Sequence, residues 1–229
     1  MDTKTNPIER FINEQVEKWK SIRAAVDKKG AARIPVITVC MEPGSGGSIV
    51  AQGIAKRLDL DFFHREIIEA ISKSAESSPP VLEKLEKERL SGIQDFVSSL
   101  VSDKYLHPDV YLEHLKKVVS AIGIRGHAVI VGRGANFILP PEKRFSVRVV
   151  APLEIRVQNI ARAYGISEEV AEQRVLKRES RRSDFVRKSF NADIADTINY
   201  DFILNTGKLS IEDAVEAVSV FWSGKYLGA

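Results

Sequence analysis

The stretch with the clearest chemical potential runs from Glu42 to Ser48 and reads EPGSGGS. Glycine lacks a Cβ atom, so the backbone can turn sharply there and point its N–H groups inward, and a following helix N-terminus adds partial positive charge. These features form a nest for an anion such as a phosphate. Gly44, Ser45, Gly46, Gly47 and Ser48 are therefore the candidate cofactor-binding residues, and a plain strand-to-helix turn is the alternative.

A standard phosphate-binding loop carries a lysine after its last glycine, but here that position is Gly47. The lysine neutralises charge that develops on the β and γ phosphates, and the Ser or Thr that follows it ligates magnesium. Ser48 keeps the magnesium role open. Glu42 can approach the ion directly or through water, or can merely bond loop amides. If the chain transfers a phosphoryl group, another cation must replace the lysine.

The richest source of cations is the run RVLKRESRRSDFVRK. On a helix, Arg174, Arg178 and Arg181 fall near one face, with Arg182 beside it and Arg187 beyond the expected helix end. Such a run is either a solvated basic face or a mobile lid that swings over bound phosphates. Arginine forks match phosphate oxygens geometrically, so the run is the candidate for the missing charge.

A further arginine follows the apolar run HAVIVG, within VGRGANFILPP. The GRG piece is a poor dinucleotide fingerprint, because it lacks the third glycine and an acidic residue about twenty positions on. Arg133 is either a structural anchor for the next helix or a clamp for an anionic substrate. Asp61 and Asp184 are candidates for acceptor or lid contacts.

Five apolar, β-branched runs alternate with helical patterns and could place these residues at one edge of a sheet. The expected strands are IPVITVC, DFF, HAVIVG, FSVRVV and YDFILNT. Continuous apolar strands separated by helices predict a parallel sheet covered on both faces, which is the α/β class. The stretch between Phe63 and His127 is too long for one crossover and is helical with breaks, which predicts an inserted helical lobe over about 65–125. The lid is expected over about 174–192.

Residues 1–33 are expected to form an N-terminal helical extension ahead of a main domain over 34–229. Apolar residues recur in the extension at intervals of three or four, which gives one apolar stripe. That stripe either covers the main domain or forms a partner contact, such as a homodimer.

The composition restricts the class of protein. The chain has 229 residues, of which 44% are hydrophobic and 28% charged, as in ordinary globular proteins. No apolar run approaches the length of a membrane span, and no apolar signal-peptide core is seen, so no membrane partner and a cytoplasmic location are expected. A net charge of +3 is too small to indicate a nucleic-acid partner. It is equally compatible with binding of an anionic small molecule.

Several longer motifs follow one another along the chain. They are EPGSGGSIVAQGIAKRL with DFFHREII shortly after it, VIVGRGANFIL, APLEIRVQNI followed by YGISEEVAEQRV, and NYDFILNTGKLSIEDAVEAV. In their order and spacing, these motifs resemble the cytidylate kinase-like family, a branch of the P-loop nucleoside monophosphate kinases. The resemblance extends from about Val36 to Trp222 and leaves out the N-terminal helix.

The resemblance implies a three-layer P-loop kinase fold with a five-stranded parallel sheet, an inserted acceptor lobe and an arginine-rich lid. It implies that residues 44–48 hold the phosphates of ATP with Mg2+, and that Arg133 holds the acceptor phosphate. It also implies that Arg181, Arg182 and Arg187 act from the lid. The leading hypothesis is transfer of the ATP γ-phosphoryl group to a nucleoside monophosphate, with CMP or dCMP as the expected acceptor.

Three positions depart from the pattern of a standard phosphate-binding loop or of the related kinases. Gly47 replaces the lysine, Met41 stands where the kinase-like branch usually has arginine, and Gly134 stands where true cytidylate kinases carry an acid. The departures favour, as an alternative, a catalytically impaired relative that binds a nucleotide as a sensor or partner-binding module. A third hypothesis, RNA binding through the lid, predicts a steep salt dependence, but the basic run contains only one aromatic residue, Phe185.

Overall fold

The computed structural model describes residues 10–18, 34–64, 67 and 108–226. Segment 10–18 is helical and, with Phe63, His64, Ile67 and α6 (Pro108–Arg125), belongs to one compact unit. Residues 34–62 and 126–226 belong to a second unit. Most of the lobe expected over about 65–125, and most of the extension expected over 1–33, lies outside the described residues.

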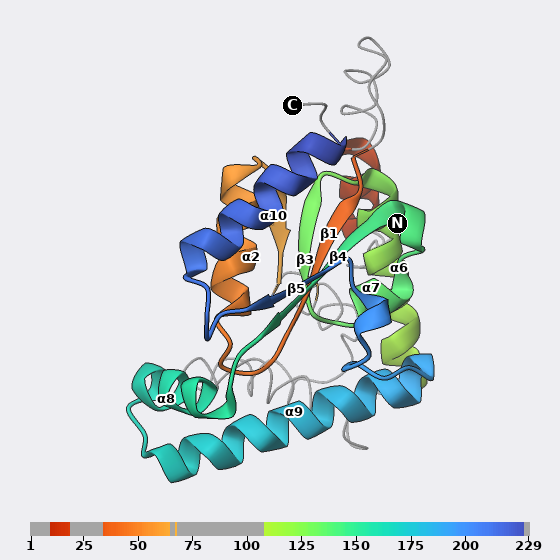
Figure 1. Ribbon diagram of the computed structural model, residues 1–229. Coiled ribbons are helices and arrows are strands. Elements are labelled where there is room, and N and C mark those ends of the chain that lie inside the picture. The colour runs from red at the N-terminus through yellow and green to blue at the C-terminus, as the bar shows by residue number, and fades with distance from the viewer. Residues whose placement is uncertain (1–9, 19–33, 65–66, 68–107, 227–229) are drawn as a thin grey trace. The chain divides into compact units, whose positions relative to one another are not determined.

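A five-stranded sheet forms the centre of the second unit (Figure 1). Its strands are β1 (Val36–Met41), β2 (Asp61–Phe63), β3 (Ala128–Val131), β4 (Arg144–Val150) and β5 (Phe202–Asn205). They are arranged in the order β2-β3-β1-β4-β5, and β1 pairs in parallel with β3 and β4, as β4 does with β5. The buried, β-branched strands fit a sheet covered on both faces, and the predicted five-stranded parallel sheet is confirmed.

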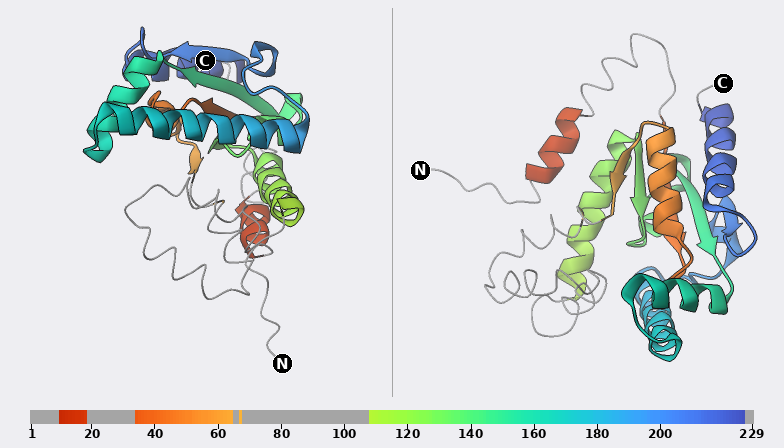
Figure 2. Two further views of the ribbon diagram at one scale, coloured as in Figure 1. Left: turned by 90° about the horizontal axis from the view of Figure 1, so that it is seen from below. Right: turned by 90° about the vertical axis from the view of Figure 1, so that its left-hand side faces the viewer.

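The helices of the second unit are α2 (Gly47–Arg57), α7 (Ala135–Ile138), α8 (Leu153–Tyr164), α9 (Glu168–Phe190) and α10 (Ile211–Tyr226). Two short 3-10 turns span Pro141–Lys143 and Thr197–Asn199. Helices α2 and α10 pack side by side on one face of the sheet (Figure 1). Figure 2 shows α9 extended across the sheet in the view from below. Of the helices in the described residues, none is long and apolar enough to cross a membrane.

Helix α9 carries the basic run and is longer than that run. It begins after Ser167, whose side chain accepts a hydrogen bond from the Val170 N–H. The negative charge of Glu168 in the first turn stabilises the helix by its interaction with the helix dipole. It ends at Asn191, which is left-handed with φ of 50°. Arg187 therefore lies inside the helix, and the expectation that it falls beyond the helix end was wrong.

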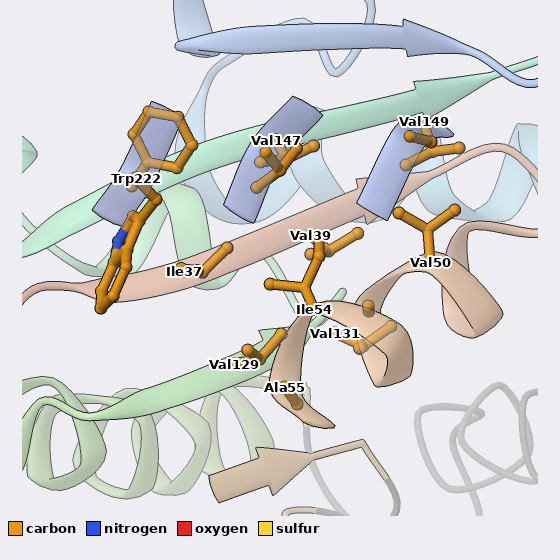
Figure 3. Close-up of a cluster of buried hydrophobic side chains, with 14 of the residues drawn as sticks. Ile37, Val39, Val50, Ile54, Ala55, Val129, Val131, Val147, Val149 and Trp222 are labelled. Atoms are coloured by element: carbon orange, nitrogen blue, oxygen red, sulfur yellow. The ribbon is translucent and has the colours of Figure 1, made fainter. Parts of the chain in front are cut away.

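Alternate residues of the central strands form the core under α2 and α10. Strand residues Ile37, Val39, Val129, Val131, Val147 and Val149 cluster with Val50, Ile54 and Trp222 of the two helices (Figure 3). Since side chains of a strand alternate between faces, the residues between them point the other way, and those of β1 and β4 include polar ones. There the Thr38 and Ser146 hydroxyls lie 3.0 Å apart. The core fixes β1 and α2 and thus both ends of the loop between them.

Candidate phosphate-transfer site

The glycine loop joins the end of β1 to the start of α2. Gly44 and Gly46 have φ of 84° and 75°, a conformation that favours glycine, and Gly46 caps the helix. Across the described residues, the N–H groups of Gly46, Gly47 and Ser48 donate to no backbone carbonyl. The first N–H groups of a helix have no partner within it, so these donors are available to an anion at the N-terminus of α2.

Neighbouring elements hold the loop in place. Asn159 Nδ2 donates to the Gly44 carbonyl oxygen at 2.9 Å, and Thr206 Oγ1 donates to the Ser45 carbonyl oxygen at 2.6 Å. The Gly44 backbone lies so close to Arg156 of α8 that a Cβ atom would overlap the Arg156 carbonyl oxygen. Ser45 Oγ is buried without a hydrogen-bond partner in the described part of the chain. A buried hydroxyl of this kind is stabilised when a ligand supplies the missing bond.

Packing explains why no side chain leaves the loop at Gly47. A Cβ atom on Gly47 would lie 2.5 Å from the Met41 Cβ, closer than real Cβ contacts allow, and 3.1 Å from the Val149 Cβ, tighter than most of them. Met41 itself packs against the core cluster that α2 shares with the sheet. The place from which a lysine would extend is therefore filled by the last side chain of β1.

Arg182 brings a cation from α9 to the start of the loop. Its side chain is half-buried, and its Nη1 donates to the Met41 carbonyl oxygen at 2.6 Å. Desolvation is the main cause of the lowered pKa of Arg182, which is about 10. The positive charges of Arg133 and Arg178 also lower it, whereas Cys40 and Glu179 raise it. The guanidinium remains charged at neutral pH. Three arginine charges thus act on one another beside the loop, an arrangement that an anion would stabilise.

The other two expected lid arginines lie elsewhere. The Arg187 side chain is 70% exposed, and its Nη2 pairs with Asp184 Oδ1 of the same helix at 2.6 Å. Arg181 is exposed. The structure therefore brings Arg182 to the loop and leaves Arg181 and Arg187 on the outer side of α9.

The first half of α9 packs against α8 as a hairpin. Val157 and Ile160 of α8 form a buried cluster with Ala171 and Val175 of α9. Arg178 lies over the ring of Tyr164, with 5.6 Å from its Cζ to the ring centroid, and is buried there. This contact and the buried cluster set the rotation of α9, and therefore which of its arginines face inward.

Arg133 lies in an unusual turn at the carboxyl end of β3. Gly132, Arg133 and Gly134 have φ of 68°, 60° and 63°, which is uncommon for a residue with a side chain. Such backbone strain is frequent at functional sites. Asp61, the other candidate for acceptor binding, lies beside the start of β3, because its N–H donates to the His127 carbonyl oxygen at 3.2 Å. The structure therefore does not bring Asp61 and Arg133 together.

Glu42 is held by two arginines. Its Oε1 lies 3.5 Å from Arg148 Nη2, and its Oε2 lies 3.4 Å from Arg156 Nε and accepts from the Ala151 N–H at 3.1 Å. The sequence left two roles for Glu42, magnesium binding and hydrogen bonding to backbone amides. The structure shows the second, although the amide is that of Ala151, between β4 and α8, and not one of the loop. Magnesium ligation would require the carboxylate to leave the arginines.

Sequence reasoning missed these two buried arginines. Arg148 also donates to the Ile194 carbonyl oxygen, and burial lowers its pKa while neighbours that include Tyr200 raise it above the ordinary value overall. A charge within the apolar run FSVRVV was the available signal, because buried charges are almost always paired. Arg156 gave no signal, since a helix normally carries arginines on its surface. Its Nη1 lies 3.2 Å from Glu179 Oε2 of α9.

The residues at the loop fit a magnesium ion that is held mainly by a nucleotide. No three His, Cys, Asp or Glu side chains within the described ranges gather as a metal site of the protein alone. Magnesium at a nucleotide typically takes one or two protein ligands together with phosphate oxygens and water. Ser48, the second residue of α2, is half-exposed beside the open N–H groups and can supply one such ligand.

Comparison with known sequences places this chain among kinase-like proteins. The model of the cytidylate kinase-like family matches residues 36–208. A cytidylate kinase of Ignicoccus hospitalis is 29% identical over 183 residues, which cover 80% of this chain and 96% of that protein. A cytidylate kinase of Pyrococcus horikoshii is 27% identical over 179 residues, covering 77% of this chain and 82% of that protein.

Comparison with solved structures bears on the fold. An uncharacterized protein from Eubacterium ventriosum aligns with a TM-score of 0.61 and 17% identity, over 82% of this chain and 98% of that one. The shikimate kinase of Bacteroides thetaiotaomicron aligns with a TM-score of 0.52 and 13% identity, over 83% of this chain and 98% of that one. With the strand order, these similarities confirm the expected three-layer P-loop kinase fold.

Proposed function

Because this chain belongs to the cytidylate kinase-like family, we propose that it binds ATP with Mg2+ at the glycine loop and transfers the γ-phosphoryl group to a nucleoside monophosphate. CMP and dCMP are the expected acceptors, since the related proteins are cytidylate kinases. The observation that carries the proposal is the contact between Arg182 and the Met41 carbonyl. It joins the cation-rich helix to a loop whose N–H groups can receive an anion.

Each part of the loop has a role in this proposal. The N–H groups of Gly46, Gly47 and Ser48 bind the β and γ phosphates, and the Ser45 hydroxyl supplies a further bond. Magnesium at Ser48 neutralises charge on the phosphate oxygens and orients them when it is bound. Arg133 binds the phosphate of the acceptor with its planar fork.

The chemistry needs positioning and charge more than a base. An oxygen of the acceptor phosphate attacks the γ phosphorus and forms a new P–O bond. The bond from that phosphorus to the β–γ bridging oxygen breaks, and ADP leaves with the electron pair. The attacking oxygen is already anionic, so no general base is required. Arg182 exchanges the Met41 carbonyl for a phosphate oxygen and stabilises the charge that develops there, which the missing lysine would otherwise do.

The packing of Met41 against Gly47 favours a second candidate function, a catalytically impaired nucleotide-binding sensor or partner-binding module. In that case Arg182 stays on the Met41 carbonyl, and the nucleotide binds without transfer. The helical extension over 1–33 would then be the expected partner surface, and a homodimer through it stays a prediction.

Calorimetric titration with ATP and Mg2+, followed by ADP release with CMP, dCMP, UMP and AMP, tests the proposal. Acceptor-dependent ADP release near the kinase range of about 1 to 100 per second supports the kinase and identifies its acceptor. Binding without turnover supports the sensor. Absence of ATP binding contradicts both functions and leaves the glycine loop as a turn.

A further inference from the structure

Five residues of the second unit form a ring at the start of the glycine loop, closed by three side-chain contacts and two connections along the chain. Arg182 of α9 donates to the Met41 carbonyl oxygen at 2.6 Å, and Met41 is followed by Glu42. Glu42 Oε2 lies 3.4 Å from Arg156 Nε of α8. Arg156 Nη1 lies 3.2 Å from Glu179 Oε2, and Glu179 precedes Arg182 by three residues on α9. These five residues are called the loop–helix ring below.

Arg156 is the buried centre of the loop–helix ring. Its side chain is 8% exposed, against 17% for Glu42 and 38% for Glu179, and its Nε also donates to the Ala151 carbonyl oxygen at 3.0 Å. A guanidinium is planar and rigid, so one arginine can hold two carboxylates in a defined geometry. Ion pairs removed from water are screened less than surface pairs. Arg156 therefore fixes α9 relative to the loop.

We propose that Arg156 is a positioning residue, which sets where Arg182 meets the loop by binding Glu42 and Glu179 at the same time. Residues three apart on a helix are neighbours on its surface, so a shift of α9 at Glu179 also displaces Arg182. The inference rests on the proposed function, in which Arg182 acts on phosphate. Arg156 needs no contact with a substrate in this role.

A double-mutant cycle tests the proposal with Glu179→Gln and Arg182→Gln. Glu179 is the suitable first target because it is partly exposed and glutamine keeps its size, so the fold is expected to persist. Glu179→Gln is expected to lower kcat about tenfold or more, as small misplacements of catalytic groups do, with little change in the KM for ATP. In the Arg182→Gln background it is expected to have no further effect, because the displaced group is gone.

Two controls separate positioning from a general loss of stability. Glu172→Gln alters an exposed acid of the same helix and is expected to leave kcat unchanged. Arg156→Lys keeps the charge without the fork and is expected to reproduce the loss seen with Glu179→Gln. Additive effects of Glu179→Gln and Arg182→Gln, or a normal kcat in Glu179→Gln, would overturn the proposal.

A second readout is independent of turnover. If the wild type transfers no phosphoryl group to any acceptor, the proposed function fails, and the loop–helix ring is judged by hydrogen exchange of the amides in 41–49. Glu179→Gln is then expected to accelerate exchange there, with no further acceleration when it is combined with Arg182→Gln. Independent accelerations, or exchange at the wild-type rate in Glu179→Gln, would contradict the proposal.

Discussion

Phe190, the last residue of α9, lies against Gly134 so closely that a Cβ atom at position 134 would overlap its ring. The ring also stacks on Phe137, with centroids 5.6 Å apart and an interplanar angle of 18°, and meets the edge of Phe185 at 5.8 Å. The contact anchors the end of α9 to the turn that carries Arg133. Since α8 holds the other end, α9 is packed at both ends, and a lid movement would have to separate Phe190 from Gly134.

The overlap predicts different costs for two similar substitutions. Gly132 and Gly134 share a left-handed backbone, but a Cβ atom at Gly132 would meet nothing within 4 Å. Gly132→Ala is expected to lose about 1 kcal/mol of unfolding free energy, from backbone strain alone. Gly134→Ala adds about 1–3 kcal/mol for overpacking against Phe190. Urea denaturation measures the unfolding free energy of both variants. Equal losses would show that the Phe190 ring moves aside at no cost.

Restoring the lysine is not expected to restore an ordinary loop. Gly47→Lys places a Cβ atom 2.5 Å from the Met41 Cβ, so it is expected to lower the unfolding free energy by about 1–3 kcal/mol. Met41→Gly removes that Cβ atom and is expected to recover part of the loss in the Gly47→Lys background. Thermal unfolding of both single variants and the double variant measures this coupling. A fully stable Gly47→Lys protein would show that packing does not exclude the lysine.

Arg182 and Arg187 are expected to differ in their effect on turnover. Arg182→Gln is expected to lower kcat about 100- to 1000-fold with a smaller change in ATP affinity, because the charge acts mainly in the transition state. Arg187→Gln is expected to have a much smaller effect, because Arg187 is exposed and paired with Asp184. Steady-state kinetics with ATP and CMP measures both. Similar losses in the two variants would mean that α9 rotates on substrate binding.

The fold could be predicted because its signals are local. Each central strand is a mainly apolar run rich in β-branched residues, and helical patterns separate the runs, so the parallel sheet follows from the sequence. The residue at which α9 ends could be predicted less accurately than the sheet. It depends on Asn191 adopting a left-handed conformation, while the preceding residues have no strong stop signal.

The candidate site could be predicted less completely, because its contacts join distant segments. The glycine loop and Arg133 were visible as motifs at strand ends, but the partners of Glu42 are more than 100 residues away. The rotation of α9 was also hidden. The sequence grouped Arg181 with Arg178, whereas packing on α8 turns Arg178 and Arg182 inward, four residues apart, and leaves Arg181 exposed.

The two candidate metal ligands can be separated by comparing stability with magnesium dependence. Glu42→Gln removes the charge that balances Arg148 and Arg156, so it is expected to lower the unfolding free energy by about 3 kcal/mol while the magnesium requirement of the reaction stays the same. Ser48→Ala is expected to keep stability within about 0.5 kcal/mol, because Ser48 is half-exposed, but to raise the magnesium requirement about tenfold. Urea denaturation and magnesium titration of the kinase reaction measure the two properties. A stable Glu42→Gln protein with a raised magnesium requirement would mean that the carboxylate leaves its arginines to bind the ion when ATP is present.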